Sequence, residues 1–145
     1  MDIRQITPNY AVSPQIAPED CAAIAAAGFT TIICNRPDSE IPMDVCADAV
    51  RAAAEAAGLK FVVLPLTHQT MHAENIAAQR AALDGSDGPV LAYCASGTRS
   101  SIAWSLGQAG HLSCAEILAA TIQAGYDLSG LTPQLEAAAE AQKPG

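Results

Sequence analysis

YCASGTRSS, residues 93–101, joins a short apolar run to a segment with helical spacing. The apolar run is 89–92, and the helical spacing continues over 102–106. This order indicates a strand, a tight loop and a helix, with Cys94 at the start of the loop and Arg99 near its end. In α/β proteins such a loop lies where ligands bind, so the stretch bears on both fold and chemistry.

Short apolar runs alternate with helical patterns along the rest of the chain. We expect strands at 30–34, 61–64 and 90–93, one or two strands within 5–12, and helices over 18–28, 45–56 and 74–83 with further helices after residue 101. Strands separated by helices form parallel sheets covered on both faces. The sequence therefore predicts a single α/β domain over residues 1–145, with three layers and a mostly parallel central sheet flanked by helices.

The chain is acidic: 15 Asp and Glu against 7 Lys and Arg give a net charge of -8. Such a surface repels nucleic acid and anionic membranes, so any anion site must be local. No stretch approaches the roughly 20 apolar residues that span a bilayer, and the first residues lack the pattern of a secretion signal. We expect a cytoplasmic protein whose partners include neither nucleic acid nor membrane.

Five cysteines are widely spaced without a Cys-x-x-Cys pair, and the three histidines are scattered. This pattern favours neither a disulfide framework nor a metal site, and no cofactor is implied. Cys34 ends the strand predicted at 30–34. It is either a small core residue or, if it approaches Cys94, a sulfur that could resolve an oxidised or persulfidated form of Cys94.

The loop after Cys94 has the composition of an anion cradle. Gly97 permits a backbone turn that points successive N–H groups inward, and the following helix adds its positive end. Arg99 can bind an oxyanion with two parallel donors. All these groups favour the thiolate of Cys94. We expect Cys94 and Arg99 to be catalytic, with the substrate bound by the backbone of the four residues between them, Ala95, Ser96, Gly97 and Thr98.

Two neighbouring positions extend this prediction. Ser100 could donate a hydrogen bond to the Cys94 sulfur and improve it as a leaving group in a second half-reaction. The loop 35–40 follows another parallel strand and should reach the same rim. There Arg36 either adds a second positive group for the substrate or pairs with Asp38 or Glu40.

Several separate motifs resemble the phosphatase-like domain of the beta-lactamase-hydrolase-like proteins. They are 94–100, Gly28-Phe29, 35–38, the strand end at Pro65, and 125–128, so the resemblance covers nearly the whole chain. It implies the fold of dual-specificity phosphatases, although the family is also described as a sulfur transferase family.

The sequence departs from the phosphatase pattern in ways that bear on this choice. The phosphatase signature has five residues between cysteine and arginine, whereas this loop has four and in that respect resembles the rhodanese loop, which holds a persulfide. Dual-specificity phosphatases also have an aspartate that acts as the general acid, on the loop after the strand equivalent to 61–64. This chain has Thr-His-Gln-Thr at 67–70 of that loop. His68 and Asp38 are therefore the two candidates for the general acid.

Three functions follow. The favoured one is a cysteine-dependent phosphatase that acts on a small phosphorylated substrate through a phosphocysteine. The alternative is a sulfur transferase that takes a sulfane-sulfur substrate and carries a persulfide on Cys94. The third is a non-catalytic module that binds an oxyanion.

Overall fold

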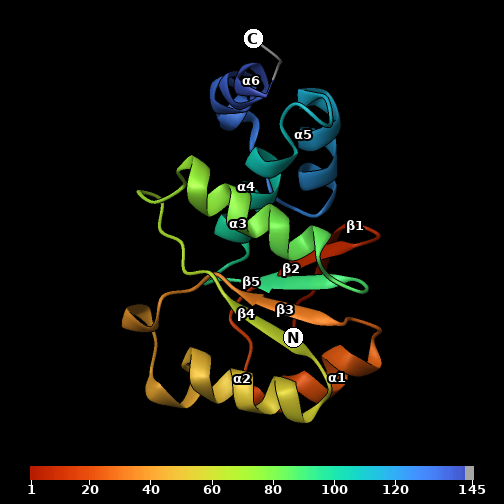
Figure 1. Ribbon diagram of the computed structural model, residues 1–145, viewed down its shortest axis with the longest axis vertical. Coiled ribbons are helices and arrows are strands. Elements are labelled where there is room, and N and C mark those ends of the chain that lie inside the picture. Colours follow the sequence, from red (N-terminus) through yellow and green to blue (C-terminus); the bar gives the residue numbers. More distant parts are fainter. Residues whose placement is uncertain (143–145) are drawn as a thin grey trace.

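The computed structural model describes residues 1–142. At its centre lies a five-stranded sheet in the order β1-β2-β5-β3-β4 (Figure 1). The strands are β1 (Arg4–Thr7), β2 (Tyr10–Ser13), β3 (Thr31–Cys34), β4 (Lys60–Val63) and β5 (Val90–Tyr93). The pair β1–β2 is antiparallel and the other neighbouring pairs are parallel, which confirms the mostly parallel sheet.

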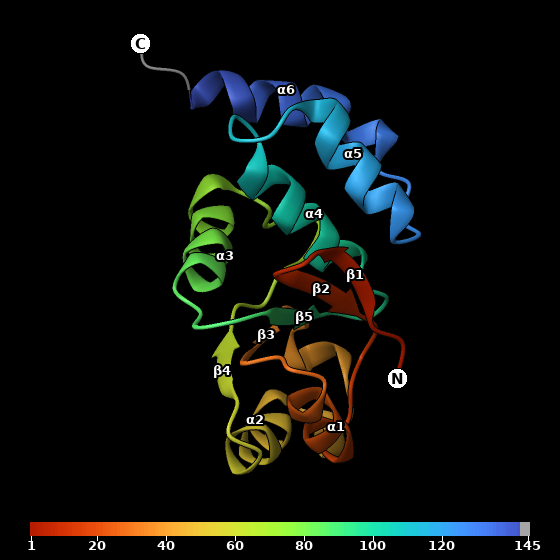
Figure 2. The ribbon, with the colours of Figure 1, turned by 90° about the vertical axis from the view of Figure 1, so that its right-hand side faces the viewer.

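Helices cover both faces of this sheet. They are α1 (Cys21–Ala26), α2 (Ala47–Ala56), α3 (Ala73–Asp84), α4 (Thr98–Gln108), α5 (Cys114–Gln123) and α6 (Thr132–Ala141), with short 3-10 turns at Pro18–Asp20, Asp38–Glu40, Met43–Val45 and Ser129–Leu131. Figure 2 shows α1 and α2 on one face and α3 and α4 on the other, with α5 and α6 outside α4. The predicted three-layer α/β architecture is confirmed.

The apolar side chains of the strands alternate between two cores. Ile32 and Leu91 pack toward α1 and α2, whereas Ile33 and Ala92 pack with Trp104 of α4 on the opposite face. All residues of β3 and β5 are buried, because both strands are covered on both faces. This explains why these strands appear in the sequence as continuous apolar runs.

The structure refines two of the predicted elements. The segment predicted to hold one or two strands contains two, β1 and β2, and the helix predicted over 18–28 is a 3-10 turn followed by α1, which ends at Ala26. Gly28 follows that end with a φ of 100°, which favours glycine and stops the helix.

The parallel arrangement brings three loops to one edge of the sheet. Cys34 lies opposite both Tyr93 and Val63, so β3, β4 and β5 end at the same level. The main-chain N–H of Asn35 donates to the Tyr93 carbonyl oxygen at 2.8 Å, which fixes the start of the two loops relative to each other. Within residues 1–142, no helix combines the length and the apolar character that a membrane span needs.

Candidate active site

The loop between β5 and α4 curls around the sulfur of Cys94. Cys94 is buried, and the Gly97 N–H donates to its Sγ at 3.1 Å. Gly97 has a φ of 94°, and a Cβ on it would collide with the hydroxyl of Tyr126. Tyr126 in turn lies under the guanidinium of Arg4, which is 5.6 Å from the ring centroid. Glycine is therefore required at position 97 by both backbone conformation and space.

The carbonyl groups of the loop are bound on its outer side. The Gln15 N–H donates to the Ala95 carbonyl oxygen at 3.4 Å, and the Tyr126 hydroxyl donates to the Ser96 carbonyl oxygen at 2.9 Å. In a trans peptide plane the N–H points opposite to the C=O, so the N–H groups of Ser96 and Gly97 face the inside of the loop. Together with the first turn of α4, they are the groups from which the predicted anion cradle would be built.

Arg99 is held in place by a carboxylate that the sequence did not assign to the site. Its Nη1 and Nη2 donate to the two carboxylate oxygens of Glu40 at 2.8 and 2.7 Å, and Nη1 also donates to the Leu66 carbonyl oxygen at 2.8 Å. These bonds use three of the five guanidinium N–H groups. These bonds to oxygen leave the edge formed by Nε and the second N–H of Nη2, and, after the hydrogen bond to Glu40, interaction of Arg99 with Cys94 adds to the raised pKa of the arginine.

The ion pair of Arg99 and Glu40 is charged near neutral pH. The Arg99 hydrogen bonds lower the pKa of Glu40, and the same bonds raise the pKa of Arg99. Glu40 also forms an ion pair with Arg36, in which Arg36 Nε lies 3.4 Å from Glu40 Oε1. Of the two roles predicted for Arg36, the structure shows pairing, and the partner is Glu40. Glu40 lies in the loop 35–40 that was expected near the site. From the sequence it was expected only as a possible partner of Arg36, so its bond to Arg99 was not predicted.

A buried polar network lies beneath the loop and includes Ser100. The Ser100 hydroxyl donates to Asn35 Oδ1 at 2.8 Å, and Gln79 Nε2 donates to the same oxygen at 3.0 Å and to the Tyr10 hydroxyl at 3.1 Å. The single proton of Ser100 is thus directed to Asn35 and not, as expected from the sequence, to the Cys94 sulfur. A buried amide oxygen needs donors, which explains the difference.

The structure separates the two candidates for the general acid. Asp38 is exposed, and its carboxylate accepts a hydrogen bond from the Ala47 N–H at 2.8 Å at the start of α2. His68 is also exposed, but it lines a cleft of about 340 Å³ over the loop. The cleft is lined by Glu40, Thr67, His68, Gln69, Ala95, Ser96, Thr98 and Arg99. His68, and not Asp38, therefore stands at the mouth of the cradle.

Cys34 has the surroundings of a core residue. Its thiol donates to the Arg36 carbonyl oxygen at 3.5 Å, and it packs with Tyr93 on the face covered by α1 and α2. Burial raises the pKa of this thiol, which disfavours a thiolate. Across residues 1–142, no group of three or more histidine, cysteine, aspartate or glutamate side chains is arranged to hold a metal ion.

Sequence comparison places this site in a known family. The model of the phosphatase-like domain of the beta-lactamase hydrolase-like proteins matches residues 2–111. A beta-lactamase hydrolase-like protein of Xylella fastidiosa strain 9a5c is 32% identical over 138 residues, which are 94% of this chain and 32% of that protein. The chain thus spans about a third of the length of the curated relatives it matches.

Solved structures share the fold. The crystal structure of a candidate phosphatase from Neisseria meningitidis Z2491 is 31% identical, with a TM-score of 0.85 over 95% of this chain and 99% of that chain. The TpbA protein of P. aeruginosa, crystallised as a variant with phosphotyrosine, is 14% identical, with a TM-score of 0.69 over 99% of this chain and 91% of that chain. The fold is that of the protein tyrosine phosphatases, as the resemblance implied.

Proposed function

This chain belongs to the phosphatase-like domain family of the beta-lactamase hydrolase-like proteins, and we propose that it is a cysteine-dependent phosphatase that acts through a phosphocysteine. The observation that carries the proposal is the hydrogen bond from the Gly97 N–H to the Cys94 sulfur, inside a loop that ends at Arg99 and at the start of α4. A sulfur bound by an amide at a helix N-terminus is suited to act as a thiolate nucleophile.

The first step transfers the phosphoryl group to the enzyme. The Cys94 thiolate attacks phosphorus opposite the leaving oxygen, so that an S–P bond forms while the P–O bond to the leaving group breaks. The loop amides and the free edge of Arg99 bind the non-bridging oxygens, whose charge is spread in the transition state. The leaving oxygen takes up one proton and departs as the alcohol.

The second step restores the enzyme. Water attacks the phosphorus of the phosphocysteine, gives one proton to a base, and breaks the S–P bond. Phosphate is released and Cys94 returns as thiolate. By microscopic reversibility, the group that donates the proton in the first step accepts one in the second.

We assign this proton transfer to His68. Glu40 is unsuited, because its pKa lies below the ordinary value and its carboxylate is held by Arg99. Asp38 is occupied by the Ala47 N–H. His68 lines the cleft over the loop, and imidazole both gives and takes protons near neutral pH.

We further propose a small phosphomonoester as the substrate. The cleft over the loop has a volume of about 340 Å³, which is near the lower end of the volumes of small-molecule sites. The net charge of -8 disfavours a nucleic acid. That TpbA was crystallised with phosphotyrosine supports a phosphate ester as the kind of ligand this fold takes.

Sulfur transfer is the second candidate, and the short loop favours it. Four residues separate Cys94 from Arg99, and no aspartate follows β4 before residue 71. In this reaction the outer sulfur of thiosulfate would pass to the Cys94 thiolate as sulfite leaves, and a nucleophile such as cyanide would then take it from the persulfide. A third candidate, oxyanion binding without turnover, needs only the cradle.

Paired turnover on one preparation decides among these candidates. We would measure phosphate release from an aryl phosphate and thiocyanate formation from thiosulfate and cyanide, each beside Cys94→Ser. Phosphate release that vanishes in the variant supports the phosphatase, and Cys94-dependent thiocyanate formation without phosphate release supports sulfur transfer. Vanadate binding without either turnover leaves the binding module, and absence of any oxyanion binding refutes all three.

A further inference from the structure

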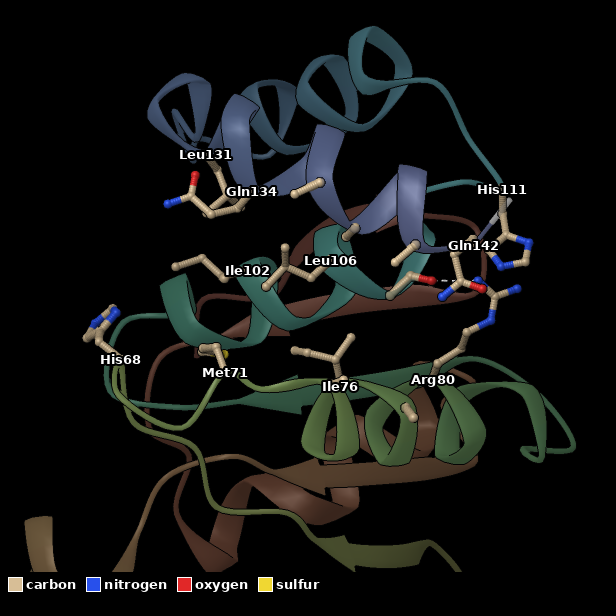
Figure 3. A pocket seen from close by; sticks show the side chains of 16 residues that line it. His68, Met71, Ile76, Arg80, Ile102, Leu106, His111, Leu131, Gln134 and Gln142 are labelled. Carbon is tan, nitrogen blue, oxygen red and sulfur yellow. Dashed lines mark hydrogen bonds between the residues drawn. The ribbon is translucent and has the colours of Figure 1, made fainter. Parts of the chain in front are cut away.

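A second and larger cleft runs along α4, between α3 and α6 (Figure 3). Its volume is about 700 Å³. Its walls are mostly apolar and include Met71, Ile76, Ile102, Leu106, Leu131 and Ala138. His68 stands at one end, and Arg80 and His111 stand at the other. We call this cleft the α4 groove.

The α4 groove begins at the candidate active site. His68 lines both the groove and the smaller cleft over the anion loop. Thr98, which lines the smaller cleft, is followed at intervals of four by Ile102 and Leu106, which line the groove. Residues at that spacing form one stripe on a helix, so one face of α4 leads from the cradle along the groove. The 11 residues of α4 give this face a length of about 16 Å.

The groove is hollow because alanines form much of its sides. Ala73 and Ala77 of α3 line it on one side, and Ala137, Ala138 and Ala141 of α6 line it on the other. Their short side chains do not reach across the space between the helices, which leaves room for an occupant between these two walls.

The far end of the groove is not a second anion site. The Nη1 of Arg80 donates to the Gly107 carbonyl oxygen at 2.6 Å, and its Nε lies 3.4 Å from the Asp84 carboxylate. Its charge is thus already compensated. The two clefts share His68, and together they fit a ligand with one oxyanion at the end near His68 and an apolar body that extends away from it.

We propose that the substrate is a phosphomonoester whose body is an extended alkyl chain, seated in the α4 groove with its phosphate in the Cys94 loop. This inference rests on the proposed function and narrows it to amphiphilic esters. The volume of the groove falls within the 300–1,000 Å³ range of ordinary small-molecule sites. Apolar contact along α4 would supply binding that the acidic protein surface cannot supply to an anion.

The test is a series of n-alkyl phosphates from methyl to octyl, assayed below the concentrations at which micelles form. Each methylene that leaves water for the groove should raise kcat/KM about twofold to fourfold. We therefore expect octyl phosphate to exceed methyl phosphate by about 100-fold or more. Ala77→Glu places a charge in the groove and should remove most of this ratio. Ala119→Glu changes an exposed alanine of α5 that lies outside the groove and should preserve the ratio.

The outcomes separate the groove from the chemistry. Turnover that does not depend on chain length overturns the groove and leaves the phosphatase intact. If no ester is hydrolysed, the phosphatase proposal fails, and binding of octylphosphonate, which cannot be hydrolysed at its P–C bond, decides the groove. Octylphosphonate that binds at least 10-fold more tightly than methylphosphonate, with the gain lost in Ala77→Glu, supports it. Equal binding of the two phosphonates overturns it.

Discussion

Replacing Glu40 with glutamine tests whether this residue positions Arg99 or competes with the substrate for it. Glu40 binds the end of the guanidinium through two bonds of 2.7 and 2.8 Å and leaves the Nε edge for an oxyanion. If Glu40 positions Arg99, the carboxylate orients the guanidinium, and loss of the carboxylate should weaken oxyanion binding. If Glu40 instead acts as a stand-in for the substrate anion, its loss should strengthen binding.

The expected size follows from the exposure of the pair. The side chain of Arg99 is 9% exposed and that of Glu40 is 34% exposed, so solvent screens the carboxylate in part. Hydrogen bonds to charged groups contribute about 1.5–3 kcal/mol each. Glutamine keeps one acceptor, and screening reduces the loss further, so we expect about 1–2 kcal/mol. This corresponds to about a 5-fold to 30-fold lower kcat/KM for an aryl phosphate.

The assay measures kcat/KM and the inhibition constant of vanadate. The inhibition constant should rise by about the same factor by which kcat/KM falls. Asp44→Asn is the matched control, because it removes the same charge from an exposed residue outside the cleft. It should stay within about twofold of the parent protein, as surface substitutions usually do. Thermal unfolding of both variants would show that the fold is intact. Tighter vanadate binding by Glu40→Gln would refute the positioning role.

Three further predictions concern the acid, the loop and the buried core. His68→Gln should lower kcat/KM about 100-fold for an alkyl phosphate and far less for p-nitrophenyl phosphate, whose leaving group needs no proton; equal losses would argue against His68 as the acid. Gly97→Ala should lower the free energy of unfolding by about 2 kcal/mol or more, whereas Gly130→Ala, which meets no atom within 4 Å, should change it little in urea titrations. Burial raises the pKa values of Tyr10 and Cys34 above their ordinary 10.0 and 9.0, so the folded state holds these protons more tightly than the unfolded chain. The contribution of these two groups to stability should therefore be fully present below about pH 9 and should be lost as the pH rises further; a free energy of unfolding in urea that stays unchanged between pH 8 and pH 11 would contradict this.

The sheet and the tight loop after Cys94 could be predicted because their signals are local. Buried parallel strands appear as unbroken apolar runs, and the strand, loop and helix around Cys94 lie within about twenty consecutive residues. Gly97 could be assigned its turn for the same reason, since the need for a positive φ shows in the residue itself.

The side-chain partners could not be predicted, because they join distant parts of the chain. Glu40 meets Arg99 across 59 positions, and Ser100 meets Asn35 across 65. Nothing near either residue in the sequence specifies which polar group will face it. Asp38 shows the same limit, because the sequence indicates a possible acid but does not show that its carboxylate accepts a hydrogen bond from the Ala47 N–H at the start of α2.

The contact of Tyr126 with the Ser96 carbonyl oxygen determines whether the loop after Cys94 could keep its shape in another protein. The family match ends at residue 111, yet this hydroxyl fixes a peptide plane of the loop from beyond that point, and Arg4 at the other end of the chain covers its ring. Transplanting 94–100 into another α/β scaffold would carry over the cysteine and the arginine without the brace that turns the amides inward. A working graft would need a hydroxyl donor at the same place. The smallest transferable unit is therefore the loop together with Tyr126 and the Arg4 side chain that covers its ring.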